Sequence, residues 1–464
     1  MLAHLKQIQP APYLRPELNL GCLTDIPTGR YHTGESGESL LSGGLALSEG
    51  VVAGPNHFKT TYEINRMLTA LDRYDESTAM FYCTELTGKQ QRIREICARN
   101  SISSLLDKDI LNSERFVYTD KGAYSGSKWR DVLMETTKHR VKRPADEMIK
   151  TPFLDHNRKN ISMLKPFINL MDSISLFMAD NVLAIQEKGG IGDSERNTES
   201  LRDALAKTQL LMEMPGFTAE RGINLMMTAH TGDVHQLDPR SPPRKKMTYM
   251  NNKIKIKNAP EKFLYLPANV WWIMGAAPMM MDDKTVEFPR DSEDNLRGDT
   301  DLVLTTCCNL RGKGGPSGLP FDLIFSQSEG LQTGLSEYYY LKDKERYGLI
   351  GNLQNFQLAL APDINLRRTV IRSKINSSYK LRRALEITSE LCQIHYMWHH
   401  LPKEFVADPQ TIFDDIKKMG YDWDELLSTR GWWTFDNFGH PMKYLSTMDI
   451  LNMRAGKYKP YWMQ

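Results

Sequence analysis

Cysteine is scarce in this 464-residue sequence, which contains six, none of them in a CxxC pair. Two of them, Cys307 and Cys308, are adjacent, a spacing that suits neither a disulfide framework nor a zinc-binding motif. No stretch approaches the ~18 consecutive apolar residues that a membrane helix needs, and the N-terminal segment lacks the charged start and apolar run of a secretory signal. We therefore expect reduced structural thiols in a soluble, cytoplasmic protein that does not bind a membrane.

The sequence also lacks a large excess of charge of either sign. It has 59 lysines and arginines and 57 aspartates and glutamates, which give a formal net charge of +2. With 41% hydrophobic and 25% charged residues, the composition is that of a globular protein and excludes a disordered chain. The length predicts a core of roughly 250 to 300 residues and a smaller second unit. A net charge near zero neither supports nor excludes nucleic-acid binding, because the clustering of charge decides it.

Short apolar runs bounded by turns predict the buried parallel strands of an α/β sheet. These runs are residues 79–83, 167–171, 223–227 and 270–274. From Leu40 a glycine-rich stretch predicts a strand and a loop that lead into a helix. Residues 198–214 predict a crossover helix, in which apolar residues recur at helical spacing. These residues are Leu201, Ala204, Leu205, Leu211 and Met212.

The chain divides into three predicted parts. Pro10, Pro12 and Pro16 predict an extended N-terminal arm over residues 1–25, which we expect to mediate oligomerisation. Residues 26–362 form the predicted core, with a strongly charged, exposed insertion near residues 138–160. Residues 363–464 form a mainly helical, tryptophan-rich C-terminal domain, and the sequence does not indicate its role.

A candidate phosphate loop stands between a predicted strand and a predicted helix, where backbone N–H groups and a helix N-terminus can face anionic oxygens. We expect Lys59 to neutralise the β and γ phosphates of a nucleotide and the Thr60 hydroxyl to hold Mg²⁺. The segment departs from the pattern GxxxxGK[ST], because Ala53 and Phe58 occupy its two glycine positions. The predicted nucleotide-binding residues are Ala53, Gly54, Pro55, Asn56, His57, Phe58, Lys59, Thr60 and Thr61.

Two acids follow later strands of the predicted sheet. Glu85 comes two residues after the end of the run 79–83, at the spacing where RecA-like folds place the carboxylate that polarises an attacking water, and we assign it as a general base beside Lys59. Asp172 ends the run 167–171, where an acid can hold Mg²⁺ through water. Either acid alone could be a surface residue at a strand end. Their order after the phosphate loop favours an ATP site.

Several segments resemble the RecA family and, within it, the phage recombinases of the UvsX type. They are IPTG (26–29), SGGL (42–45), AGPNHFKT (53–60), LMDS (170–173), AHT (229–231), EKFLYLPANVWWIM (261–274) and PFDLIFSQSEGL (320–331). That group also has a phenylalanine before the phosphate-loop lysine, although the loop here is one residue shorter. The resemblance implies a RecA-like P-loop ATPase core with ATP and Mg²⁺ as cofactors.

The resemblance also implies roles in signalling and assembly. His230 takes the position of a polar residue that senses the γ phosphate and signals to a DNA loop, and the alternative is a satisfied histidine at a strand end. Arg311 and Lys313 resemble cations that a neighbouring subunit inserts into the ATP site, as an arginine finger does, while a phosphate contact or a solvated turn is the alternative. Phe263 is expected at the subunit interface, or else as a buried aromatic.

Two loops make up the predicted DNA-binding side. Residues 186–197 are glycine-rich and polar. Residues 240–257 carry seven cations and no acid, with an aromatic and apolar side chains that can stack on bases. A solvated basic loop, or one that contacts an acidic protein, is the alternative. The predicted DNA-binding residues are Lys188, Arg196, Arg244, Lys245, Lys246, Tyr249, Lys253, Lys255 and Lys257.

We therefore expect a DNA-dependent ATPase that forms helical filaments on single-stranded DNA and promotes homologous pairing with double-stranded DNA. The resemblance suggests recombination, repair and replication in a bacteriophage, with single-strand-binding and loader proteins as further partners. A hexameric replicative helicase of the DnaB type is the first alternative. The second is a nucleotide-dependent DNA-binding mediator with little hydrolysis.

Overall fold

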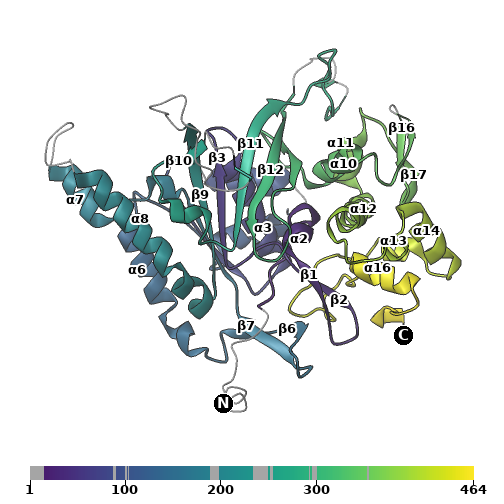
Figure 1. The fold of residues 1–464 in the computed structure, drawn as a ribbon, viewed down its shortest axis with the longest axis horizontal. Coiled ribbons are helices and arrows are strands. Elements are labelled where there is room, and N and C mark those ends of the chain that lie inside the picture. Colours follow the sequence, from purple (N-terminus) through teal and green to yellow (C-terminus); the bar gives the residue numbers. More distant parts are fainter. Residues whose placement is uncertain are drawn as a thin grey trace.

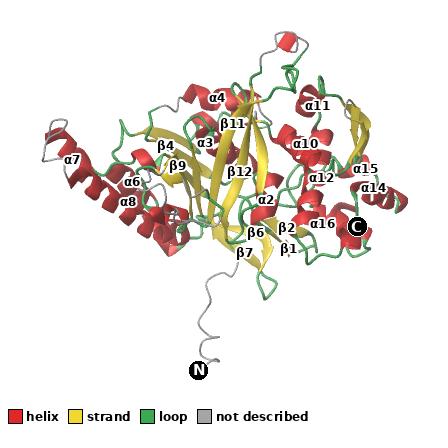
Figure 2. Ribbon diagram, turned by 45° about the horizontal axis from the view of Figure 1, so that its top comes forward, coloured by secondary structure: helices red, strands yellow, loops and turns green. Residues whose placement is uncertain are grey.

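A large central sheet flanked by helices forms the body of the protein in a computed structural model (Figures 1 and 2). The structure describes residues 15–86, 90–99, 102, 104–188, 198–233, 249–250, 254–291, 293–294, 300–352 and 355–463. Within these residues the sheet has ten strands, in the order β14-β13-β12-β11-β3-β9-β8-β4-β5, with β10 beside β9. The strands from β11 to β5 run parallel, whereas β12, β13, β14 and β10 are antiparallel to their neighbours. The predicted α/β fold with a mostly parallel sheet is confirmed.

The apolar runs of the sequence are the central strands. The strands of this sheet are β3 (Ser48–Ala53), β4 (Thr78–Cys83), β5 (Phe116–Asp120), β8 (Phe167–Asp172), β9 (Ile223–Asp233), β10 (Ile254–Ile256), β11 (Asn269–Pro278), β12 (Leu302–Gly312), β13 (Pro320–Ser326) and β14 (Gly330–Leu331). Strands in the middle of a parallel sheet are covered on both faces, which is why their sequences are continuous apolar runs. All four strands predicted from such runs are confirmed.

Helices cover the two faces of the sheet. Successive residues of β4 point to opposite faces, so Phe81 packs in one buried cluster with α3 and α4, and Tyr82 packs in another with α6 and α8. The helices around the sheet are α2 (Cys22–Thr28), α3 (Lys59–Arg73), α4 (Gln90–Arg99), α5 (Ser104–Asp107), α6 (Gly126–Thr136), α7 (Asp180–Lys188) and α8 (Glu199–Pro215). Among the described helices, none has the length and apolar character to cross a bilayer. All six cysteines are buried thiols, as predicted.

The crossover helix α8 forms where the sequence predicts it, at the edge of the molecule beside α7 (Figure 1). Its buried face differs from the expected one. Leu201, Leu205 and Met212 are among the most exposed apolar side chains of the protein, at 71%, 57% and 56%. Of the expected residues Leu211 is buried, and Lys207 and Leu210, which were not expected there, are buried as well. Helical spacing alone therefore identified the element and not the side that packs on the sheet.

The C-terminal region is mainly helical, as predicted, and lies on the opposite side from α8 (Figure 1). Its elements are α10 (Thr333–Asp343), β15 (Leu349–Asn352), β16 (Asn355–Leu358), β17 (Ala361–Leu366), α11 (Ile371–Ser377), α12 (Tyr379–Met397), α13 (Lys403–Val406), α14 (Pro409–Lys418), α15 (Trp423–Leu426) and α16 (Thr447–Arg454). Leu385 and Leu391 of α12 share one buried cluster with Trp271 and Ile273 of β11. The predicted division at residue 362 falls within β17, and it stays a prediction.

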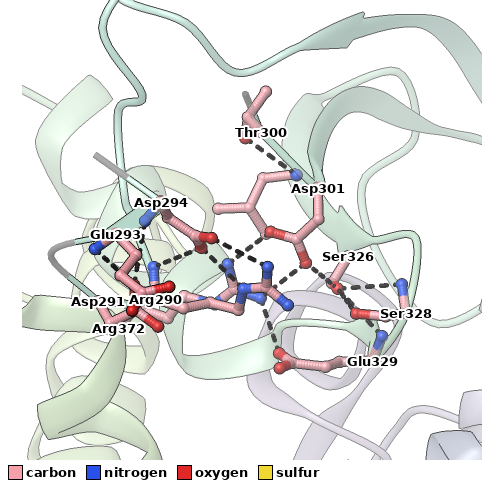
Figure 3. A network of polar contacts seen from close by, with 11 residues as sticks. Arg290, Asp291, Glu293, Asp294, Thr300, Asp301, Ser326, Ser328, Glu329 and Arg372 are labelled. Atoms are coloured by element: carbon pink, nitrogen blue, oxygen red, sulfur yellow. Dashed lines mark hydrogen bonds and ion pairs between the residues drawn. The ribbon is translucent and has the colours of Figure 1, made fainter. Parts of the chain in front are cut away.

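A network of charged groups fastens α11 to the edge of the sheet (Figure 3). The guanidinium of Arg372, which is 2% exposed, donates hydrogen bonds to both carboxylate oxygens of Asp301 at 2.7 and 2.9 Å, and to Glu329 at 2.8 Å. The pKa of Asp301 is about 2, because hydrogen bonds from Arg372 and Ser326 outweigh the opposite effect of burial. Asp301 and Glu329 lie beside strands of the core, so this network ties the C-terminal helices to it.

Two predictions about peripheral segments need correction. The described part of the predicted N-terminal arm is not free of the core, because Leu18 is buried and its N–H donates to Leu45 at 3.2 Å. Residues 1–14 lie outside the described residues. The predicted exposed insertion contains the start of a hairpin, β6 (Met148–Leu154) with β7 (Asn160–Leu164). Its Phe153 is fully buried against Trp433, with ring centroids 5.1 Å apart. Contacts with a distant part of the chain, and not the local charge pattern, therefore determine how this segment packs.

A short hairpin lies next to α2, and β15, β16 and β17 form a separate three-stranded sheet. The hairpin consists of β1 (Arg30–Thr33) and β2 (Ser39–Ser42), which pair antiparallel. Ser39 accepts a hydrogen bond from Tyr444 through its carbonyl at 2.6 Å. Contacts from the C-terminal region therefore reach the first strands of the chain as well as its centre.

Candidate nucleotide site

The candidate phosphate loop connects β3 to α3 at the carboxyl end of the parallel strands. Asn56 and Phe58 adopt positive φ angles of 59° and 60°, which turn the chain sharply before the helix begins at Lys59. A Cβ atom on Gly54 would lie 3.0 Å from the His57 ring, so glycine gives that ring its space. Phe58 stacks on Phe325 of β13, with centroids 5.1 Å apart. The glycine position of the usual pattern is therefore taken by a residue that anchors the loop to the sheet.

The start of α3 offers hydrogen-bond donors to an anion. Its N-cap residue, Phe58, has no side chain that could accept hydrogen bonds from the first turn, so these N–H groups are open to a ligand. Lys59 is only 7% exposed, and its ammonium lies 3.1 Å from a carboxylate oxygen of Glu85. A helix N-terminus and a buried cation at one point are the groups that suit the binding of phosphate.

The second predicted acid lies beside the same helix turn. Asp172 ends β8 and is fully buried. The Thr60 hydroxyl donates to one of its carboxylate oxygens at 2.8 Å, and the Thr228 hydroxyl donates to the other. Burial raises the pKa of Asp172, and the charge of Lys59 opposes this rise. The hydroxyl of Thr60 and this carboxylate together provide the hard oxygen donors that suit Mg²⁺.

Glu85 and His230 complete the cluster. Glu85 follows β4, and one of its carboxylate oxygens contacts both the Lys59 ammonium and His230 Nε2, the latter at 2.7 Å. Burial acts to raise the pKa of Glu85, but the hydrogen bond from His230 and the charge of Lys59 lower it to about 2. An ionised carboxylate next to the phosphate loop can accept a proton from an attacking water.

The structure thus brings together Lys59, Thr60, Glu85, Asp172 and His230, which the sequence placed on four separate segments. Parallel strands expose their carboxyl ends at one edge of a sheet, and this common edge explains the convergence.

Thr228 was not predicted as part of the site. It lies two residues before His230 on β9, and such spacing puts both side chains on one face of a strand. The alternation of the strand was therefore a signal that could have identified it.

Arg311 and Lys313 lie at the other end of the sheet. Arg311 of β12 pairs with Val270 of β11, whereas Ala53, the last residue of β3 and the first of the phosphate loop, pairs with Ile273. Arg311 is half-buried and Lys313 is exposed. Their position at this end of the sheet is away from the phosphate loop of their own chain, and their role in a neighbouring subunit stays a prediction beside the alternatives of a phosphate contact or a solvated turn.

The turn that follows Arg311 requires a glycine. A Cβ on Gly315 would lie 1.5 Å from the carbonyl oxygen of Pro27, so the close approach of the two backbones requires glycine.

Phe263, which was predicted at a subunit interface, is fully buried and its ring packs over Gly50 of β3. It does not stand at a subunit interface, because its own chain already covers it.

The ends of the predicted second DNA loop are paired next to the nucleotide cluster. Ile254 and Lys255 of β10 lie opposite Asp233 and Gly232 of β9, just beyond His230. Lys188 and Lys257 are exposed, Lys255 is half-buried, and Tyr249 is 49% exposed. The remaining predicted DNA-binding residues, Arg196, Arg244, Lys245, Lys246 and Lys253, lie outside the described residues. The described pairing holds both ends of the basic segment at the sheet edge where the cluster lies.

Comparison with known proteins adds little. No family model matches this chain, and no curated protein is similar to it in sequence. Among solved structures, the crystal structure of the RadB recombinase is similar to 62% of this chain and to 92% of its own length, with 13% sequence identity and a TM-score of 0.32. At that score the likeness supports no functional conclusion, and the chemistry of the site depends on its own geometry.

Proposed function

We propose that this protein is an ATP-dependent, RecA-type DNA recombinase that assembles into filaments on single-stranded DNA and promotes homologous pairing with duplex DNA. The observation that carries the proposal is the position of His230. Its ring contacts Glu85 in the nucleotide cluster, and its strand continues directly into the paired ends of the basic loop. A nucleotide-dependent change at Glu85 therefore has a short covalent path to a segment rich in cations.

The residues of the cluster fit ATP with Mg²⁺. Lys59 and the N-terminus of α3 would bind the β and γ phosphates, while Thr60 and, through water, Asp172 would hold the metal. Bound Mg²⁺ neutralises charge that develops on the phosphates. Glu85 would take the proton of the attacking water. When Lys59 leaves Glu85 to bind the phosphates, the carboxylate is free for this role.

The positions of Arg311 and Lys313 support assembly into a filament. Arg311 and Lys313 lie at the end of the sheet opposite the phosphate loop. In a filament of identical subunits, this end could face the nucleotide of the next subunit, so that hydrolysis depends on assembly. UvsX-type phage recombinases, with single-strand-binding and loader proteins as partners, are the finer assignment that the sequence motifs support.

Electron microscopy of the protein with single-stranded DNA and a non-hydrolysable ATP analogue tests this proposal. Helical filaments support a recombinase, whereas closed six-membered rings would identify a DnaB-type helicase. ATP hydrolysis measured with and without single-stranded DNA is the companion assay. Nucleotide-dependent DNA binding without measurable hydrolysis would instead identify a mediator.

A further inference from the structure

Lys207 is a buried lysine in the middle of α8, only 2% exposed. Its ammonium donates three hydrogen bonds, to the Ser175 carbonyl at 3.1 Å, to the Asn258 carbonyl at 2.8 Å and to the Asp203 carboxylate at 2.7 Å. These use all three of its protons. Burial lowers the pKa of Lys207, which the hydrogen bond to Asp203 opposes. A buried ammonium is costly unless it is fully paired, so this position is occupied for a reason other than packing.

The two carbonyls belong to segments with different roles. Ser175 follows Asp172 at the end of β8, in the nucleotide cluster. Asn258 follows β10, where the chain leaves the basic loop, and its φ angle of 50° is one that most residues avoid. Lys207 therefore holds the end of the basic loop against the segment that leads out of the nucleotide cluster.

Ser175 joins the same two segments a second time. Its hydroxyl accepts a hydrogen bond from the His230 N–H at 3.0 Å and donates to the Lys257 carbonyl at 2.9 Å. The Lys257 N–H in turn donates to the His230 carbonyl at 2.7 Å. Because the His230 ring contacts Glu85, hydrogen-bonded residues link Lys59 through Glu85, His230 and Ser175 to Lys257 at the end of the loop.

We propose that Lys207 is a positioning residue that couples the nucleotide site to the basic DNA loop, by pinning Ser175 and Asn258 to one rigid helix. This inference rests on the proposed function. With the pin in place, Asn258 is held beside Ser175, which supports the hydrogen bonds of Lys257 to Ser175 and His230, so a shift of His230 on nucleotide binding is passed to the loop end. Without it, these hydrogen bonds lose their support, the shift no longer reaches the loop, and DNA binding loses its dependence on nucleotide.

The test replaces Lys207 by methionine, which has a similar length and no charge. The measured quantity is the ratio of the Kd values for single-stranded DNA without and with a non-hydrolysable ATP analogue. Coupling between two sites usually changes affinity by about 5- to 150-fold, and in Lys207→Met we expect the ratio to fall close to 1. ATP hydrolysis in the absence of DNA should stay unchanged, because Lys207 does not touch the nucleotide cluster.

Two further variants guard against a loss of folding. Lys165→Met removes a half-buried lysine that pairs with Glu76 at 3.0 Å, far from the loop, and should keep the wild-type ratio. Ser175→Ala removes one hydroxyl bridge with little change in volume, and should lower the ratio even if Lys207→Met does not fold.

The outcomes separate this inference from the proposed function. A wild-type protein whose DNA affinity does not respond to nucleotide overturns both. A wild-type response that survives unchanged in folded Lys207→Met, or in Ser175→Ala where Lys207→Met is unfolded, overturns only the role of Lys207. Loss of the response in these variants, with the Lys165→Met ratio intact, supports the coupling.

Discussion

Replacement of Glu85 by glutamine tests the chemistry of the candidate site most directly. Glutamine keeps the shape of the side chain and can still accept a hydrogen bond from Lys59, but it cannot take a proton from water. General-base catalysis contributes about 100- to 10,000-fold to a rate, and we expect kcat for ATP hydrolysis to fall by that factor. Binding of a nucleotide analogue should persist, because Lys59 and the helix N-terminus remain.

The same substitution has a smaller, pH-dependent effect on stability. The hydrogen bond from His230 and the charge of Lys59 hold the pKa of Glu85 at about 2 against the effect of burial. A lowered pKa means that the ionised carboxylate stabilises the fold at neutral pH, and that this contribution is lost as the pH falls from the ordinary value of 4.5 through about 2. After a discount for partial exposure, we expect Glu85→Gln to lower the free energy of unfolding by about 1–2 kcal/mol at neutral pH.

Steady-state ATP hydrolysis and urea unfolding measure the two effects. Glu76→Gln is the matched control, since Glu76 pairs with Lys165 at the opposite end of β4. It should hydrolyse ATP as the wild type does. Wild-type turnover in Glu85→Gln would refute the general-base assignment, and an unchanged free energy of unfolding would refute the electrostatic account of the cluster.

Three further predictions concern DNA binding and the fold. Replacement of both Lys245 and Lys246 by alanine should reduce the slope of log affinity against log salt concentration by about 0.7 for each cation on single-stranded DNA, measured by fluorescence anisotropy. Gly315→Ala should lower the free energy of unfolding by about 1–3 kcal/mol, because the new methyl group meets the Pro27 carbonyl. Arg372→Met should cost about 3–5 kcal/mol in urea unfolding, because it leaves two carboxylates without their buried partner.

Each of these predictions has a control in the same chain. The pair Lys417 and Lys418 on α14, changed to alanine, should leave the salt slope as it is, and an unchanged slope in the loop variant would remove that pair from the DNA interface. Gly216→Ala, at a helical φ of −66° with no atom near the added methyl group, should raise stability by about 0.4–1 kcal/mol. Lys380→Met breaks an exposed pair and should cost at most about 1 kcal/mol, so equal losses in Lys380→Met and Arg372→Met would contradict the account of the buried network.

The sequence by itself determined the central strands and the residues at their carboxyl ends. A strand buried on both faces must be a continuous apolar run, and a polar residue soon after such a run lies at the common edge of a parallel sheet. Glu85 and Asp172 could therefore be predicted to meet near Lys59 before any contact was known, whereas His230 was expected there only from the resemblance to the RecA family. Local order along the chain was enough, because the geometry of parallel strands supplied the third dimension.

Only the tertiary structure decided which side chains are covered by distant parts of the chain. Leu205 of α8 is exposed while Lys207 is buried, because Lys207 finds two carbonyl acceptors on segments far from it in sequence, Ser175 and Asn258. Phe153 is buried by Trp433, and Phe263 is covered within its own chain rather than by a neighbour. Burial is a property of the neighbours that folding brings together, and these partners lie too far along the chain for local periodicity to reveal them.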